Sequence, residues 1–233
     1  MSNPLPVSYF SDTLCVWAYV SQVRLDELKT KLGGQLDLSY HFISLFGSTP
    51  KRIAEGWKER GGYGGFNEHV LGVGAQFDHI NIHPQVWKEC KPYSSAMSHL
   101  FLKSVQLLEQ DGVIADTPQS DLNQRTLFEE TAWQVRVAFF EQARDIGKRE
   151  VLMEVAEQVK LPRSAIERSL NSGEAMSELF RDQEMKDSYH LEGSPTYLLD
   201  NGRQKLYGNV GYRIIEANVQ ELLKKPQGQA SWC

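Results

Sequence analysis

The sequence predicts an α/β fold built from the two ends of the chain, with a large all-helical insertion between them. Three observations support this prediction: a strand–helix–strand pattern in residues 1–46, consecutive helical patterns over most of residues 47–186, and a hairpin followed by a helix in residues 187–233. We therefore expect residues 1–46 and 187–233 to form the two parts of one domain, with residues 47–186 as an inserted helical domain.

The first unit begins with an alternating apolar segment, residues 5–10, which predicts a short strand. From residue 15 to about residue 32, apolar side chains recur at helical spacing, and Gly33-Gly34 ends this helix. Residues 36–43 alternate again, as a second strand should. A strand, a helix and a strand of these lengths predict one βαβ unit with a right-handed crossover.

The middle of the chain changes character twice. Residues 48–83 are rich in glycine and only weakly periodic, and the stretch 56–74 is interpreted either as a mobile segment over a cleft or as a surface loop. From about residue 94 to residue 185 the pattern predicts consecutive helices, most strongly over residues 127–146. Pro162 interrupts the pattern and suits the first turn of the next helix.

The last unit returns to strand patterns. Residues 193–199 run into Asp200-Asn201-Gly202, a strong hairpin signal, and residues 204–207 follow as the partner strand. An amphipathic helix then begins after Gly211 and ends before residue 226, so that residues 227–233 are expected to form a C-terminal tail.

The composition argues against several classes of protein. The 233 residues, 41% hydrophobic and 24% charged, are typical of a globular protein with a sizeable core. A net charge of −5 gives no general reason to bind nucleic acid or an anionic membrane, and no apolar run approaches the roughly 20 residues that cross a bilayer. The N-terminus shows no secretion signal, and 3 scattered cysteines are too few for a disulfide framework. We expect a cytoplasmic protein that binds neither nucleic acid nor membranes.

Cys15 is the candidate nucleophile of this chain. It follows the first predicted strand and opens the first predicted helix, where unpaired N–H groups and the positive end of the helix dipole favour a thiolate. Asp12 is expected to cap the same helix. Ala18 occupies the position where a dithiol oxidoreductase carries its second cysteine, which excludes a two-cysteine cycle within residues 15–18. The alternative for Cys15 is a small buried core residue.

Three segments give the chain a family resemblance over nearly its whole length. They are the Cys15-Val16-Trp17 segment after the first strand, the segment 193–197 (Gly-Ser-Pro-Thr-Tyr), and the helical stretch 139–152. With the thioredoxin order of its elements, the chain resembles the DsbA-like thioredoxin family with its large helical insertion. The nearest groups are the FrnE-like proteins, the 2-hydroxychromene-2-carboxylate isomerases and the kappa-class glutathione transferases.

The resemblance transfers two residues directly. Cys15 matches the nucleophilic cysteine of the family, and Pro195 matches the cis-proline that faces it. The backbone beside such a proline can add strand-like hydrogen bonds to an extended peptide or to glutathione. Ser194, Pro195 and Thr196 are therefore candidate substrate-binding residues. Trp17 is a further candidate that would shape the opening around the sulfur, and its alternative is an ordinary core or rim aromatic.

The expected activity is thiol–disulfide exchange, as an oxidoreductase or isomerase that works through a single cysteine. Cys15 would attack a disulfide in a peptide or small molecule, and glutathione or another thiol would release the mixed disulfide. No tightly bound cofactor is expected, and glutathione is the candidate cosubstrate. Ala18 and Val16, which replace the family's second cysteine and proline, keep two alternatives open: a glutathione-dependent transferase or isomerase, and a peptide-binding module without catalysis. By analogy with the kappa class, a homodimer is a further expectation.

The other candidate residues are expected to be passive. Cys90 or Cys233 could resolve a mixed disulfide on Cys15 only if the Cα atoms come within about 7 Å. His41, at the end of the second strand, is expected either near the thiol or on the polar face of the strand. Three histidines of the glycine-rich region match no zinc spacing, and we predict no metal site there: His69, His79 and His83.

Overall fold

The computed structural model describes residues 3–224, and a four-stranded mixed sheet lies at its centre. The strands, in the spatial order β2-β1-β3-β4, are β1 (Leu5–Ser11), β2 (Leu36–Phe42), β3 (Thr196–Leu199) and β4 (Gln204–Tyr207). β1 runs parallel to β2 and antiparallel to β3, and β4 is antiparallel to β3. The two ends of the chain therefore build one sheet, as the sequence predicts.

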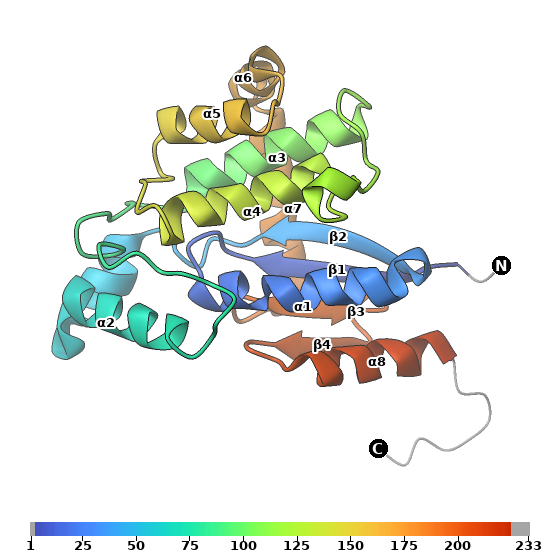
Figure 1. The fold of residues 1–233 in the computed structure, drawn as a ribbon, viewed down its shortest axis with the longest axis horizontal. Coiled ribbons are helices and arrows are strands. Elements are labelled where there is room, and N and C mark those ends of the chain that lie inside the picture. The colour runs from blue at the N-terminus through green and yellow to red at the C-terminus, as the bar shows by residue number, and fades with distance from the viewer. Residues whose placement is uncertain (1–2, 225–233) are drawn as a thin grey trace.

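Helices lie on both sides of this sheet (Figure 1). α1 (Val16–Leu32) and α8 (Tyr212–Lys224) pack on one face, and α2 (Gly62–Gly74) lies beyond the start of α1. The other helices are α3 (Ala96–Gln110), α4 (Leu127–Phe140), α5 (Arg149–Gln158), α6 (Arg163–Ser172) and α7 (Glu174–Ser188). α3 to α6 form a layer of their own, and α7 connects this layer to β2 (Figure 1).

The largest apolar cluster joins the inserted helices to the first turns of α1. It contains Cys15 and Tyr19 from the start of α1 together with residues such as Phe101 of α3 and Phe139 of α4. A second cluster fills the space between the sheet and the helices α1 and α8. The start of α1 therefore lies where the sheet domain and the inserted helices meet, and this junction positions the candidate site.

The glycine-rich segment contains a helix, so the interpretation as a surface loop is wrong for residues 62–74. Phe66, Val70 and Val73 are buried and stand at positions i, i+4 and i+7 of α2. A Cβ on Gly65 would lie 1.6 Å from the Arg60 carbonyl oxygen, so a glycine is required where the preceding turn approaches the helix. The glycines obscure the helical spacing of these three buried side chains, which is why the sequence pattern is only weakly periodic.

The C-terminal hairpin is confirmed, with Asp200, Asn201 and Gly202 at φ values of 49°, 54° and 96°. The predicted tail, residues 227–233, lies outside the described residues, and so does Cys233. Between residues 3 and 224, none of the helices has both the length and the apolar character that a bilayer-spanning helix requires.

Candidate active site

The turn between β1 and α1 holds Cys15 against a segment far away in the sequence. Cys15 is the N-cap residue of α1, its N–H donates to the Asp12 carbonyl at 3.1 Å, and its side chain is buried, with 4% of its surface exposed. The thiol donates a hydrogen bond to the carbonyl oxygen of Ser194 at 3.2 Å. The Ser194–Pro195 bond is cis, as the resemblance implies. The fold thus brings the thiol and the proline segment together.

The side chains of the proline segment are engaged within the protein. Ser194 Oγ accepts the Asp12 N–H at 2.9 Å, and Thr196 Oγ1 donates to the Gly193 carbonyl at 2.7 Å. Ser194, Pro195 and Thr196 are all buried, whereas Trp17 is half-buried against the large apolar cluster. The segment is therefore a buried wall beside the thiol, and substrate binding by these four residues stays a prediction.

The expectation of a Cys15 thiolate near neutral pH is wrong. Burial raises the pKa of the thiol above its ordinary value of 9.0, because a thiolate there would lose its hydration. The Ser194 side chain and the N–H group of Ala18 lower the pKa, but not enough to compensate, and the Asp12 carboxylate raises it further. A helix N-terminus does not by itself give a thiolate where water is excluded.

The rate of Cys15 alkylation is therefore expected to rise about tenfold per pH unit from about pH 7 to pH 9, because the thiolate is the reacting species. The measurement is iodoacetamide labelling followed by mass spectrometry of the Cys15 peptide, in a variant carrying Cys90→Ala and Cys233→Ala. A rate that levels off below about pH 8 would show that the thiol has a low pKa after all.

Asp12 does not cap α1, which corrects the second expectation for this turn. The N-cap residue of this helix is Cys15, whose side chain makes no capping hydrogen bond, and Asp12 Oδ1 instead accepts the N–H of Leu14 at 2.9 Å. Asp12 Oδ2 accepts the Phe46 N–H and the Ser95 hydroxyl, both at 2.8 Å. The completely buried carboxylate thus ties together the turn before α1, the loop after β2 and the start of α3.

His99 of α3 completes this buried polar cluster. Its Nε2 accepts the Thr13 N–H at 3.2 Å and lies 3.6 Å from Asp12 Oδ1. Burial by itself raises the pKa of Asp12, but His99 and the N–H groups of Phe46 and Leu14 more than offset it, so that the net pKa lies below its ordinary value. A buried negative charge therefore lies close to the thiol.

Sequence reasoning missed the contribution of α3 to this cluster. Ser95, Ser98 and His99 are completely buried, and Ser98 and Thr13 share a hydrogen bond of 2.7 Å between their hydroxyl groups. A histidine and serines within an otherwise apolar helical run were the available signal. The partner at Thr13, 85 residues away, could not be identified from that signal.

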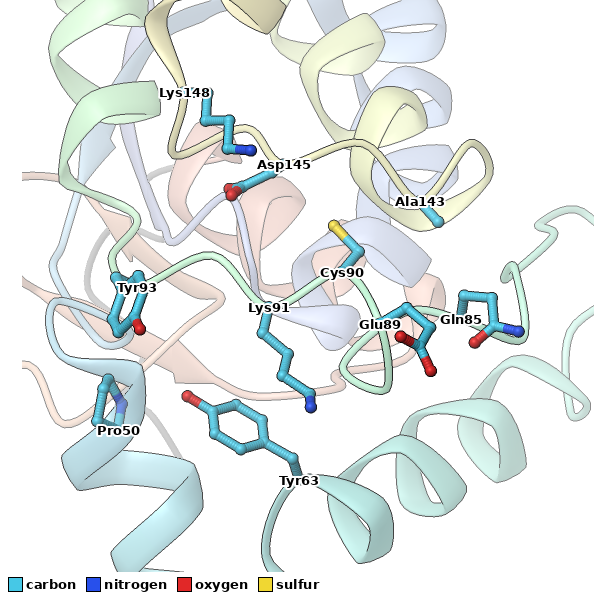
Figure 2. A pocket seen from close by; sticks show the side chains of 10 residues that line it. All are labelled: Pro50, Tyr63, Gln85, Glu89, Cys90, Lys91, Tyr93, Ala143, Asp145 and Lys148. Atoms are coloured by element: carbon cyan, nitrogen blue, oxygen red, sulfur yellow. The ribbon is translucent and has the colours of Figure 1, made fainter.

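The remaining candidate residues lie apart from the thiol. His41 Nδ1 is 2.8 Å from Asp182 Oδ1, and its ring stacks on Phe10. Cys90 is a second free thiol that lines a separate cavity with Tyr63 (Figure 2). Within residues 3–224, no group of three or more histidine, cysteine, aspartate or glutamate side chains is placed to hold a metal ion.

Comparison with known proteins supports the predicted fold. Residues 121–220 match the family model of the DSBA-like thioredoxin domain. A search of curated proteins gave no significant match.

Several solved structures share this architecture. The cytosolic disulfide reductase DsbM from Pseudomonas aeruginosa superposes with a TM-score of 0.66 at 18% identity, covering 95% of this chain and 100% of DsbM, which has also been solved with GSH. A "probable DsbA oxidoreductase" from Streptomyces coelicolor gives 0.71 at 14% identity, over 98% and 94% of the two chains. A 2-hydroxychromene-2-carboxylate isomerase gives 0.58 at 16% identity, over 94% and 97%. The DsbA-like thioredoxin fold and the resemblance inferred from the sequence are thus confirmed.

Proposed function

We propose that this chain, with its DsbA-like thioredoxin fold, carries out thiol–disulfide exchange through Cys15 alone. One observation carries the proposal: the Cys15 sulfur lies 3.2 Å from the Ser194 carbonyl oxygen, directly beside the cis peptide of Pro195. A disulfide that reaches this sulfur would lie against the backbone of Ser194, which can align it by strand-like hydrogen bonds, whereas the Pro195 carbonyl already accepts the Gly208 N–H at 2.8 Å.

The exchange has two balanced steps. Cys15 loses its proton, its thiolate attacks one sulfur of a substrate disulfide, and the other substrate sulfur leaves as a thiolate that takes up a proton. A second thiol, for which glutathione is the candidate, then attacks the mixed disulfide and restores Cys15. Ala18 makes this external thiol necessary, because the helix offers no second cysteine at that position. The net result is reduction of the substrate disulfide and formation of a disulfide that contains the external thiol.

Burial of Cys15 implies that this exchange is slow in the closed structure. The sulfur must become accessible before it can react, so we propose that the turn formed by residues 12–15 opens locally. Glutathione is the proposed cosubstrate because the similar reductase DsbM has been solved with GSH. The description of DsbM as cytosolic likewise supports a cytoplasmic setting for this chain.

Incubation with oxidised glutathione tests the proposal. At about pH 8.5, where more of the thiol is ionised, intact-protein mass spectrometry is expected to show one added glutathionyl group that dithiothreitol removes. The adduct should persist in the Cys90→Ala, Cys233→Ala double variant and disappear when Cys15→Ser is added to that variant. Absence of an adduct in the double variant would exclude Cys15 as the exchanging thiol.

A second candidate function is favoured by the protonated state of Cys15. A neutral thiol can donate a hydrogen bond, as Cys15 does to Ser194, and could donate one equally well to the thiolate of a bound glutathione. That chemistry would suit a glutathione-dependent transferase or isomerase, and the fold similarity to 2-hydroxychromene-2-carboxylate isomerase is in keeping with it. Non-covalent glutathione binding, with turnover of an aryl electrophile and no mixed disulfide, would favour this candidate. Full retention of every activity in Cys15→Ala would instead indicate a peptide-binding module.

A further inference from the structure

A cavity of about 730 Å³ lies among segments that the proposed exchange does not use. Its walls come from the region around the start of α2, the segment that precedes α3, and the turn after α4 (Figure 2). Cys15 and the proline segment are not among its lining residues. The cavity is therefore distinct from the candidate active site.

Four charged side chains surround this cavity in a balanced set: Glu89, Lys91, Asp145 and Lys148. In the part of the chain that the structure describes, none of the four forms an ion pair. Asp145 and Lys148 lie on one rim, whereas Lys91 extends to the opposite rim, with its ammonium group 5.5 Å from the centre of the Tyr63 ring (Figure 2). A ligand can therefore pair with positive and with negative side chains of the cavity, and no existing salt bridge has to break.

The floor between these charges is polar but neutral. Burial raises the pKa of the Cys90 thiol to about 12, so this sulfur stays protonated near neutral pH. Gln85 also lines the cavity, and its buried side-chain oxygen has no hydrogen-bond partner among residues 3–224. A ligand with an N–H donor could supply the bond that this oxygen lacks, which a purely apolar ligand could not.

The geometry points to a binding site for a short zwitterionic peptide, two or three residues long, with free amino and carboxyl ends. Each rim offers one charge of each sign, so the carboxylate can pair with a lysine on one rim while the ammonium group pairs with the acidic side chain on the other, Lys148 with Glu89 or Lys91 with Asp145 (Figure 2). A simple anion or cation would use only half of these charges and would face charges of its own sign. The volume lies in the range of about 300–1,000 Å³ that encloses drug-sized ligands, which is more than a single free amino acid needs. This site would work whether or not Cys15 exchanges disulfides.

Isothermal titration calorimetry with triglycine tests the site on the full-length protein. Triglycine is expected to bind, and N-acetyltriglycine amide, which lacks both charges, is expected not to. Asp145→Asn keeps an acceptor for the Gly147 N–H, which Asp145 Oδ1 receives at 3.0 Å, and Lys148→Ala removes one cation. Each variant should weaken triglycine binding about threefold to tenfold.

Lys88→Ala is the matched control, because Lys88 is an exposed lysine of the same segment that does not line the cavity. It should bind triglycine like the unaltered protein, and the thermal unfolding midpoint of every variant should show that it is folded. Absence of triglycine binding, equal binding of the capped peptide, or unchanged affinity in both cavity variants would overturn the proposal. The titrations contain no disulfide and no added thiol, so their result is independent of the exchange proposed for Cys15.

Discussion

Replacing Asp182 with alanine is expected to lower the free energy of unfolding by about 3–5 kcal/mol, because it strands a buried positive charge. Asp182 lies on α7 with 2% of its surface exposed, and its Oδ2 is 2.7 Å from both Lys103 Nζ and the Phe42 N–H. Its Oδ1 is 2.8 Å from His41 Nδ1. One carboxylate therefore joins the inserted helices α3 and α7 to the edge strand β2. Urea unfolding followed by circular dichroism measures the loss.

Asp187→Ala is the control for this prediction, since it removes a carboxylate from the same helix where the side chain is 74% exposed and pairs with Lys186. Its effect should stay below about 1 kcal/mol. Adding Lys103→Met to Asp182→Ala removes the stranded ammonium group and is expected to recover part of the loss. If Asp182→Ala lowers the free energy of unfolding no more than the control does, the buried ion pair does not hold the helices on β2.

The order of elements was predictable because each element leaves a local pattern. The alternation in residues 5–10 and 36–43 and the turn residues Asp200-Asn201-Gly202 depend only on neighbours in the sequence, and β1, β2 and the hairpin formed where expected. The helix α2 escaped prediction because glycines are as numerous in it as hydrophobic residues, although the three apolar side chains it buries keep helical spacing. A sequence pattern thus predicts an element where apolar or turn residues mark most of its positions, and it fails where few positions are marked.

The chemistry of the site depended on contacts that no local pattern reports. The approach of Cys15 to Ser194, 179 residues away, was accessible only through the family resemblance. The raised pKa of Cys15 and the true partners of Asp12 follow from burial and from the distant residues Phe46 and Ser95. Burial is a property of the packed molecule. An argument from the helix dipole alone therefore gave the wrong direction for the pKa shift of the Cys15 thiol.

Replacing Asp12 with alanine is expected to lower the free energy of unfolding by about 3–5 kcal/mol, because three buried donors lose their acceptor together. These donors are the N–H groups of Leu14 and Phe46 and the hydroxyl of Ser95. Asp12→Asn retains one acceptor oxygen and removes the charge, so it should cost less, about 1–3 kcal/mol. Urea unfolding of both variants at the same pH measures the difference, and equal costs would mean that the hydrogen bonds are not the source of the stability.

The Asp12→Asn variant also tests how the charge of Asp12 affects the Cys15 thiol, separately from the hydrogen bonds that Asp12 accepts. Because the Asp12 carboxylate raises the pKa of Cys15, its removal should lower that pKa and speed iodoacetamide labelling of folded protein at about pH 8 by about threefold to tenfold. Asp37→Asn is the control, since this exposed carboxylate of β2 is not among the groups that shift the Cys15 pKa. Asp12→Asn is thus expected to lower the stability of the protein and to raise the reactivity of the Cys15 thiol. Unchanged or slower labelling of folded Asp12→Asn would leave desolvation as the sole cause of the raised pKa.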